Sequence, residues 1–298
     1  MRVRRGRVNR RDFHLKANDK ETFMKKIISI FIIALVLGIS SAAMAEKPSV
    51  TIGLKTWIAT WERKGEIIVD EDTDETLKFS DKSDYGLMYG PVINLRYEKL
   101  FASLSYMMGG DLNFERDQVD NYFNDYFNDL DLGPDYGINY DVNSKDDRTD
   151  FDIAIGYYVH PNISIFLGYK NVDIEEKIKV AWDVEPFSDA YYDDIKPGEI
   201  PFKESGTIKG PAFGVSGNYP IGETNWILLG SLSYLSLDGK WEGESHGDFT
   251  GPSLEIGGAY IFDNVPVSIT AGYKYQSLES DKGKDIFSGL TFGVNYTL

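Results

Sequence analysis

The last nine residues, Leu290-Thr291-Phe292-Gly293-Val294-Asn295-Tyr296-Thr297-Leu298, alternate hydrophobic side chains with small or polar ones. A period of two residues places these two kinds of side chain on opposite faces of a β-strand. No stretch after residue 45 has the pattern of a helix of useful length. The same alternation recurs in nine earlier segments, at 50–54, 87–97, 102–106, 151–159, 163–169, 213–219, 226–234, 252–262 and 267–275. The sequence therefore predicts ten antiparallel strands.

The connections between these segments alternate in length. Short ones lie at 98–99, 160–162, 220–225 and 263–266. Long ones lie at about 64–84, 110–147, 175–205, 238–248 and 279–285. Short turns on one side and long loops on the other are typical of a barrel in the outer membrane, with the long loops extracellular. Residues 46–298 are thus expected to form one continuous meander.

Each expected strand has an aliphatic face with aromatic residues near its ends, and a second face of Gly, Ser, Thr, Asn and a few charges. A soluble sandwich would bury the aliphatic face, whereas a membrane barrel turns it toward lipid and places Tyr and Trp at both interfaces. We expect the second arrangement, an all-β, single ten-stranded antiparallel up-and-down transmembrane β-barrel. Ten strands enclose little more space than the eight whose interior side chains fill, so a wide diffusion channel is not expected.

A secretory signal peptide is predicted over 24–45. A short basic segment from Met24 precedes an apolar run of 13 positions at 27–39, and Ala43 and Ala45 fit the small residues of a cleavage site. That run is too short for a transmembrane helix, which needs about 20 apolar residues. We expect cleavage after Ala45 and export to the outer membrane. Residues 1–23 form an upstream extension, so either translation starts at Met24 or the basic region is unusually long.

The terminal strand, 290–298, resembles the closing strand of the small outer-membrane β-barrels of Gram-negative bacteria. Those proteins usually end on an aromatic residue, whereas this chain ends on Leu298. The resemblance implies that this strand is read by the outer-membrane insertion machinery and that the barrel is surrounded by outer-membrane lipid. It covers 46–298 as an architecture and singles out no family within the group.

Composition excludes several functional classes. The 298 residues include no cysteine, which excludes disulfide scaffolds, thiolate metal sites and cysteine nucleophiles. The net charge is −16, and residues 1–45 hold 10 of the 31 Lys and Arg but only 3 of the 47 Asp and Glu. The remaining chain is strongly acidic, so nucleic acid is not an expected partner.

Six charged side chains are expected in the lumen. Extending the register from the turn at 160–162 places Asp152 opposite Lys170, and the turn at 263–266 places Glu255 opposite Lys274. Cross-strand pairing is expected because an unpaired charge in a narrow interior is costly. Lys55 and Arg96 also point inward, with no partner that the register assigns. The set is predicted to be a structural plug, or else a gate or selectivity filter.

The dipeptide Gly-Pro recurs at 90–91, 210–211 and 251–252, each time within or at the start of an expected strand. Proline lacks the amide donor of a strand ladder. Each pair is therefore expected at a bulge or near the rim of the barrel.

The long loops are acidic, with 11 Asp and Glu against 2 Lys and Arg in 110–147. Asp129, Asp131 and Asp135 have the spacing of a calcium loop, although the bidentate Glu of such a loop is missing. The alternative is a solvated surface that repels anions. Aromatic residues in the same segment could contact an extracellular partner, or could form a small core of the loop itself.

Histidine offers one enzymatic alternative. Glu244 and His246 lie two residues apart in the fourth long loop, which is similar to the acid–histidine pair of omptin proteases, also ten-stranded barrels. In that family the acid is aspartate, and the second-loop candidates here, Asp117 and Asp120, have a different spacing. His160 lies in a short turn, so it is not expected to serve an active site at the surface.

The function expected from the sequence is therefore a non-enzymatic outer-membrane barrel with acidic extracellular loops, in a structural or surface-interaction role. No cofactor is expected. The alternatives are a narrow solute pore and, with less support, an omptin-like surface protease.

Overall fold

The structure is a computed structural model that describes residues 48–70, 75–115, 138–184, 198–281 and 283–298. These residues belong to one compact unit, Pro48–Leu298. Its strands are β1 (Ser49–Asp70), β2 (Glu75–Lys82), β3 (Gly86–Tyr97), β4 (Leu100–Gly109), β5 (Leu112–Glu115), β6 (Ile138–His160), β7 (Ile163–Val184), β8 (Gly198–Pro220), β9 (Trp226–Trp241), β10 (Glu244–Ile261), β11 (Val267–Ser280) and β12 (Gly283–Thr297).

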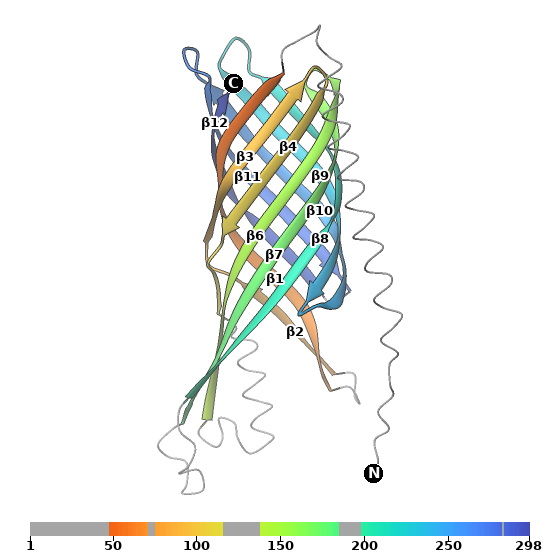
Figure 1. The fold of residues 1–298 in the computed structure, drawn as a ribbon. Coiled ribbons are helices and arrows are strands. Elements are labelled where there is room, and N and C mark those ends of the chain that lie inside the picture. Colours follow the sequence, from red (N-terminus) through yellow and green to blue (C-terminus); the bar gives the residue numbers. More distant parts are fainter. Residues whose placement is uncertain (1–47, 71–74, 116–137, 185–197, 282) are drawn as a thin grey trace, which may run out of the picture. The chain divides into compact units, whose positions relative to one another are not determined.

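Ten of these strands close into an antiparallel barrel (Figure 1). Neighbours along the chain pair with one another, and β1 pairs with β3 on one side and β12 on the other. β2 and β5 are short additions beyond the wall, paired with β1 and β6. The predicted ten-stranded antiparallel barrel is confirmed. Every expected strand segment lies within one of the ten wall strands or, at its C-terminal end, within a residue of it.

The short connections are turns as predicted, but the strands run far into the segments expected to be long loops. β6, β7 and β8 are each 22 or 23 residues long, and in Figure 1 they continue past the other strands. The expected loop 175–205, for example, contains the last ten residues of β7 and the first eight of β8. The prediction of long irregular loops is therefore wrong in extent.

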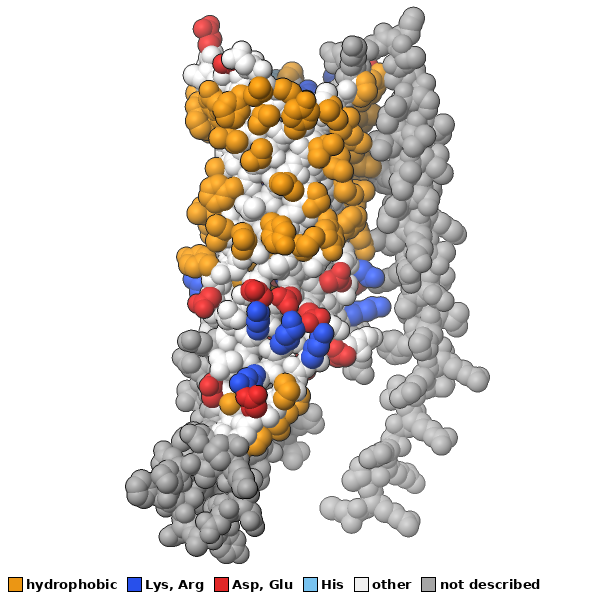
Figure 2. Space-filling view, turned by 60° about the vertical axis from the view of Figure 1, so that its left-hand side comes forward, with side chains coloured by type: hydrophobic (Ala, Val, Ile, Leu, Met, Phe, Trp, Pro, Cys, Tyr) orange, Lys and Arg blue, Asp and Glu red, His pale blue; other side chains and the backbone are white. Residues whose placement is uncertain are grey.

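The outer wall carries a band of exposed aliphatic and aromatic side chains, visible in Figure 2. On β7 it consists of Ile163, Ile165, Leu167 and Tyr169, and on β12 of Leu290, Phe292, Val294 and Tyr296. Leu167 is 63% exposed and Val294 56%, values that a water-soluble protein would not repeat around a whole wall. The expected outward orientation of the aliphatic face is confirmed.

Beyond this band the polarity of the two faces inverts. On β7 the outer residues become Asn171, Asp173 and Glu175, while Val172 and Ile174 on the inner face are buried. Figure 2 shows charged side chains gathered next to the apolar band. The strands there have a hydrophobic core inside and a polar surface outside, as in a soluble barrel. This change of polarity explains why the strands expected from an apolar outer face end at the edge of the band.

The three Gly-Pro pairs interrupt the ladder with the following strand in the same way. Paired residues are missing opposite 90–91, 210–211 and 251–252, and each proline is exposed on the outer wall. A Cβ on Gly210 would lie 2.2 Å from the Ser236 carbonyl oxygen, so only glycine permits this close approach. The expected irregularity at these sites is confirmed.

Among the described residues no helix is both long and apolar enough to cross a membrane. The signal peptide predicted over 24–45 lies outside those residues.

Candidate functional site: the lumen

Four buried aromatic rings form a layer across the lumen, where the polarity of the wall inverts. The Trp57 and Phe287 ring centroids are 4.6 Å apart, and Trp61 lies 5.9 Å from both Phe287 and Phe114. All three pairs are edge-to-face, the geometry that the ring quadrupole favours. The rings come from β1, β5 and β12, so this layer joins strands that are distant in the sequence. Met88 and Leu112 are buried in the same cluster.

Arginine side chains cover this aromatic layer. The Arg63 guanidinium carbon lies 3.9 Å from the Trp61 ring centroid, and that of Arg148 lies 4.0 Å from Phe287. Arg148 is 4% exposed. A guanidinium keeps its charge when buried, and its planar face stacks on rings while its edge donates hydrogen bonds.

A chain of ion pairs continues from Arg148. Its Nε lies 2.6 Å from Asp150 Oδ1, and Lys170 Nζ lies 2.5 Å from Asp150 Oδ2 and 3.0 Å from Asp152 Oδ1. Asp152 and Lys170 are direct partners in the β6–β7 register, the position that the turn at 160–162 predicts. The sequence register did not include Arg148 and Asp150, although both lie on the same inward face of β6.

A second group of ion pairs lies on the other side of the aromatic layer, beyond the apolar band. Arg63 pairs with Asp146 and, at 3.3 Å, with Glu176, while Trp61 Nε1 donates to Asp285 Oδ1 at 3.0 Å. Burial lowers the Arg63 pKa, but the carboxylates of Asp146 and Glu176 outweigh it and raise that pKa. Burial raises the pKa of the Asp285 carboxyl, because the nearby Arg63 only partly offsets the loss of water.

The pairing of Glu255 differs from the sequence expectation. Glu255 and Lys274 are direct partners in the β10–β11 register, yet the ion pair of Glu255 is with Lys55, at 2.6 Å across the lumen. Thr291 Oγ1 donates a further hydrogen bond to Glu255 at 3.4 Å. The Lys274 ammonium lies instead 4.5 Å above the Trp57 ring. Lys55 thereby has a partner that the register of adjacent strands could not identify.

Arg96 is apart from this group. Its guanidinium carbon lies 4.5 Å from the Tyr158 ring centroid, near the short turns. The structure therefore brings five of the six expected lumen residues toward the centre of the barrel and leaves Arg96 at its end.

Exposure falls sharply along this chain of charges. The side chains of Lys55, Glu255 and Asp152 are 26%, 31% and 34% exposed. Those of Lys170, the register partner of Asp152, and of Asp150, two residues further from the short turns on β6, are 4% and 2% exposed. Among the charged side chains of the lumen, the exposed fraction is therefore low from Lys170 and Asp150 onward, toward the aromatic layer.

Sequence reasoning missed the aromatic layer and both arginines. The inner face of these strands otherwise holds Gly, Thr and Ser, but at three positions it holds a large ring: Trp57, Trp61 and Phe287. These large residues were the signal in the sequence for a filled lumen. A large ring at a lumen position of a narrow barrel predicts that the lumen is filled at that level.

Several loop predictions fall outside what the structure describes. Asp117, Asp120 and the calcium candidates Asp129, Asp131 and Asp135 lie in the segment 116–137 that is not described. Glu244 and His246 lie on β10, but their side chains are likewise not described. Among the described residues, no three Asp, Glu or His side chains are grouped so that they could hold a metal ion. The calcium and omptin hypotheses stay predictions.

No protein-family model and no curated protein sequence matches the chain. Solved structures of barrels do. The translocator domain of the autotransporter NalP from Neisseria meningitidis is 13% identical, over 93% of this chain and 97% of that one, with a TM-score of 0.37. The Pseudomonas putida toluene transporter TodX is 10% identical over 85% and 89%, with a TM-score of 0.33. The attachment invasion locus protein Ail of Yersinia pestis is 10% identical over 85% and 100%, with a TM-score of 0.30.

These neighbours are a translocator domain, a toluene transporter and an attachment invasion protein. They have different roles, and at these TM-scores none of them bears on what this chain does. The assignment of the fold rests on the strand pairing and on the exposed apolar band.

Proposed function

We propose that the protein is a non-enzymatic outer-membrane barrel with a closed lumen, which holds a rigid sheet outside the cell for contact with an external partner. The observation that carries this proposal is the extension of β6, β7 and β8 past the apolar band. Three paired strands of 22 to 23 residues are longer than a membrane-spanning strand, which needs about 9–11.

The outer face of this extension carries exposed ion pairs that join neighbouring strands. Lys203 pairs with Glu175 at 2.9 Å, and Lys177 pairs with Asp147 at 2.7 Å across to β6. Hydrogen bonds from Lys203 and Lys177 hold the pKa of the Glu175 carboxyl below its usual range. Such a ladder keeps the strands in register outside the membrane, although each exposed pair stabilises it only slightly.

The opposite face of the extension is apolar. Ile200 and Phe202 on β8 are 46% and 50% exposed, and Ile178 and Val180 on β7 lie beside them in the register. Exposed apolar side chains that adjoin one another favour an interaction surface. This supports contact with a partner rather than a purely structural role.

The buried lumen supports a closed barrel. Trp57, Phe287, Arg148 and Asp150 are each at most 4% exposed, so side chains occupy the lumen at this level. In planar lipid bilayers the refolded protein is therefore expected to give no stepwise conductance. Regular open channels in the wild-type protein would contradict the closed lumen.

The interaction surface is tested with cells that display the protein, using adherence to polystyrene as an apolar probe. The variant Ile200→Asp/Phe202→Asp should adhere less than wild type. The matched control Glu199→Gln/Lys203→Gln changes the opposite face of the same strand and should adhere as wild type does. Equal adherence of all three, at equal surface expression, would contradict the proposed interaction surface.

A narrow solute pore is the second candidate, and one observation favours it. The partly exposed lumen charges Lys55, Glu255 and Asp152 indicate a solvated lumen on the side of the short turns. The same bilayer recording separates the two candidates, because a pore must conduct.

A further inference from the structure

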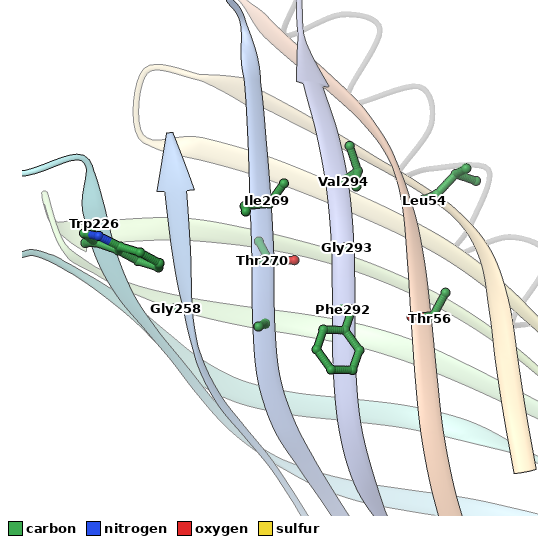
Figure 3. A pocket seen from close by; sticks show the side chains of 10 residues that line it. Leu54, Thr56, Trp226, Gly258, Ile269, Thr270, Phe292, Gly293 and Val294 are labelled. Carbon is green, nitrogen blue, oxygen red and sulfur yellow. The ribbon is translucent and has the colours of Figure 1, made fainter. Parts of the chain in front are cut away.

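The outer wall has a hollow of about 520 Å³ between β1, β9, β10, β11 and β12 (Figure 3). Its floor contains Gly258 and Ala271, which are direct partners across β10 and β11. Its rim contains Trp226, Ile269, Phe292 and Val294. The side chains of Ile269, Phe292 and Val294 belong to the lipid-facing band and are 42–56% exposed.

Register explains why the wall is hollow here. Ala271 on β11 is paired with Phe292 on β12 and with Gly258 on β10, and these three residues form one row across the strands. In the adjacent outward-facing row, Ile269 is paired with Val294. Two small residues thus lie side by side within rows of large ones. The backbone does not require glycine at 258, because an added Cβ would meet only the Ile227 carbonyl oxygen, at 3.6 Å. The space is left open although a side chain could fill it.

The depth of the hollow determines what can occupy it. Trp226 and Tyr260 are register partners with ring centroids 5.1 Å apart, and they lie at the short-turn end of the band, where an aromatic girdle meets the lipid headgroups. The hollow begins at this girdle and extends into the band. The surrounding medium at that depth is hydrocarbon.

We propose that this hollow binds one acyl chain of a phospholipid from the leaflet on the side of the short turns, with the Trp226 indole at its headgroup end. Large apolar side chains on the rim and only glycine and alanine named on the floor fit a flexible hydrocarbon chain. The amphipathic indole suits the boundary between acyl chains and headgroups. A second copy of this barrel would need a protruding ridge of matching shape to fill the same space.

The test compares two glycine substitutions on the same wall. Gly258→Leu fills the hollow. Gly230→Leu is the matched control, since Gly230 faces outward on β9 next to Ile256, outside the hollow, and an added Cβ there meets nothing within 4 Å. Each protein is delipidated in detergent, incubated with phosphatidylethanolamine, and analysed by native mass spectrometry.

Wild type and Gly230→Leu are expected to retain one phospholipid, and Gly258→Leu none. A second readout uses phosphatidylethanolamine with brominated chains, which quench tryptophan fluorescence. Of the five tryptophans, Trp226 is the one on the lipid-facing band, since Trp57 and Trp61 face the lumen and Trp182 and Trp241 lie beyond the band. In wild type, quenching of Trp226 by bound brominated lipid should persist after dilution into unbrominated detergent micelles. In Gly258→Leu this persistent quenching should be lost.

Two results would overturn the proposal. The first is equal lipid retention and quenching in Gly258→Leu and wild type. The second is a wild-type dimer that Gly258→Leu dissociates, since the hollow would then hold a second copy. Heat-modifiable gel migration of all three proteins reports whether each barrel is folded.

Discussion

Arg63 and Arg148 each contact a carboxylate with one part of the guanidinium and an aromatic ring with another. A buried charge is tolerated only when it is paired and its donors are satisfied, and removal of one partner is then strongly destabilising. Lysine carries the same charge but cannot stack on a ring and donate sideways at once. At the scale of single residues, the lumen is thus closed by side chains that have two partners each.

Two of the three carboxylates near Arg63, those of Asp146 and Asp285, are expected to respond differently to neutralisation. Asp146 is fully buried and ion-paired with Arg63, so Asp146→Asn should lower the free energy of unfolding by about 3–5 kcal/mol at neutral pH. Asp285 has a raised pKa, which means that its charged form is disfavoured by folding. Asp285→Asn keeps an acceptor for Trp61 Nε1 and should leave the barrel at least as stable as wild type. The measurement is urea unfolding in phospholipid vesicles.

The pH dependence of the Asp285 contribution has a defined sign. A carboxyl whose folded pKa is raised stabilises the fold when protonated, and this contribution is lost as the pH rises from the unfolded pKa through the folded one. The free energy of unfolding of Asp285→Asn, relative to wild type, should therefore increase as the pH rises from acid to neutral. A relative stability that decreases over this range would show that the carboxylate is stabilised by Arg63 instead.

At the Gly-Pro site 210–211, the close approach of two backbones is expected to require glycine. Gly210→Ala would place a Cβ 2.2 Å from the Ser236 carbonyl oxygen, so the backbone of β8 or β9 must shift. We expect a loss of about 1–3 kcal/mol in the free energy of unfolding. Gly230→Ala, where nothing lies within 4 Å of the added Cβ, serves as the control and should be close to neutral. Equal losses would mean that the close approach to Ser236 is not what makes glycine necessary at 210.

Strands were predictable from the sequence wherever an apolar outer face alternates with a small inner face. Their extensions were not, because the alternation of β7 continues through Val172 and Ile174 with the faces exchanged. A stretch whose outer residues are charged, such as Asp173 and Glu175, resembles a loop when a strand is expected to have an apolar outer face. The same limit applies to contacts: a turn fixes which residues of adjacent strands face each other, as with Asp152 and Lys170. It says nothing about Lys55 and Glu255, which meet across the lumen.

The inverted part of the strands should behave as a soluble hydrophobic core. Ile174 is 3% exposed on the inner face of β7, so Ile174→Ser should lower the free energy of unfolding by about 2–4 kcal/mol. Lys177→Ser, three residues on and exposed on the outer face, should change it by less than about 1 kcal/mol. The comparison is made by urea unfolding of the folded barrels in the same vesicles. A neutral Ile174→Ser would mean that the extension contributes no core.

The whole molecule combines three environments along one set of strands: partly exposed charges on the short-turn side of the lumen, a buried layer, and an extension beyond the apolar band. Because Asp152 is 34% exposed and Asp150 only 2%, the change from wet to dry occurs within two residues of β6. On the short-turn side the buried layer begins with Trp57, Phe287 and the ion pairs of Arg148 and Lys170, and it continues into the hydrophobic core inside the extension.

Removal of two of the four rings of the aromatic layer is expected to open a narrow pore. Trp57→Ala/Phe287→Ala deletes the two rings that lie 4.6 Å apart, and Lys274 and Arg148 then lose the surfaces on which they stack. We expect this variant to conduct small ions in planar bilayers, with a conductance well below that of sixteen-stranded porins because the lumen of ten strands is narrow. Trp226→Ala removes a ring from the outer wall instead and should remain closed. If the double variant is folded, as shown by heat-modifiable migration, and still gives no conductance, then the remaining buried side chains and ion pairs close the lumen without these two rings.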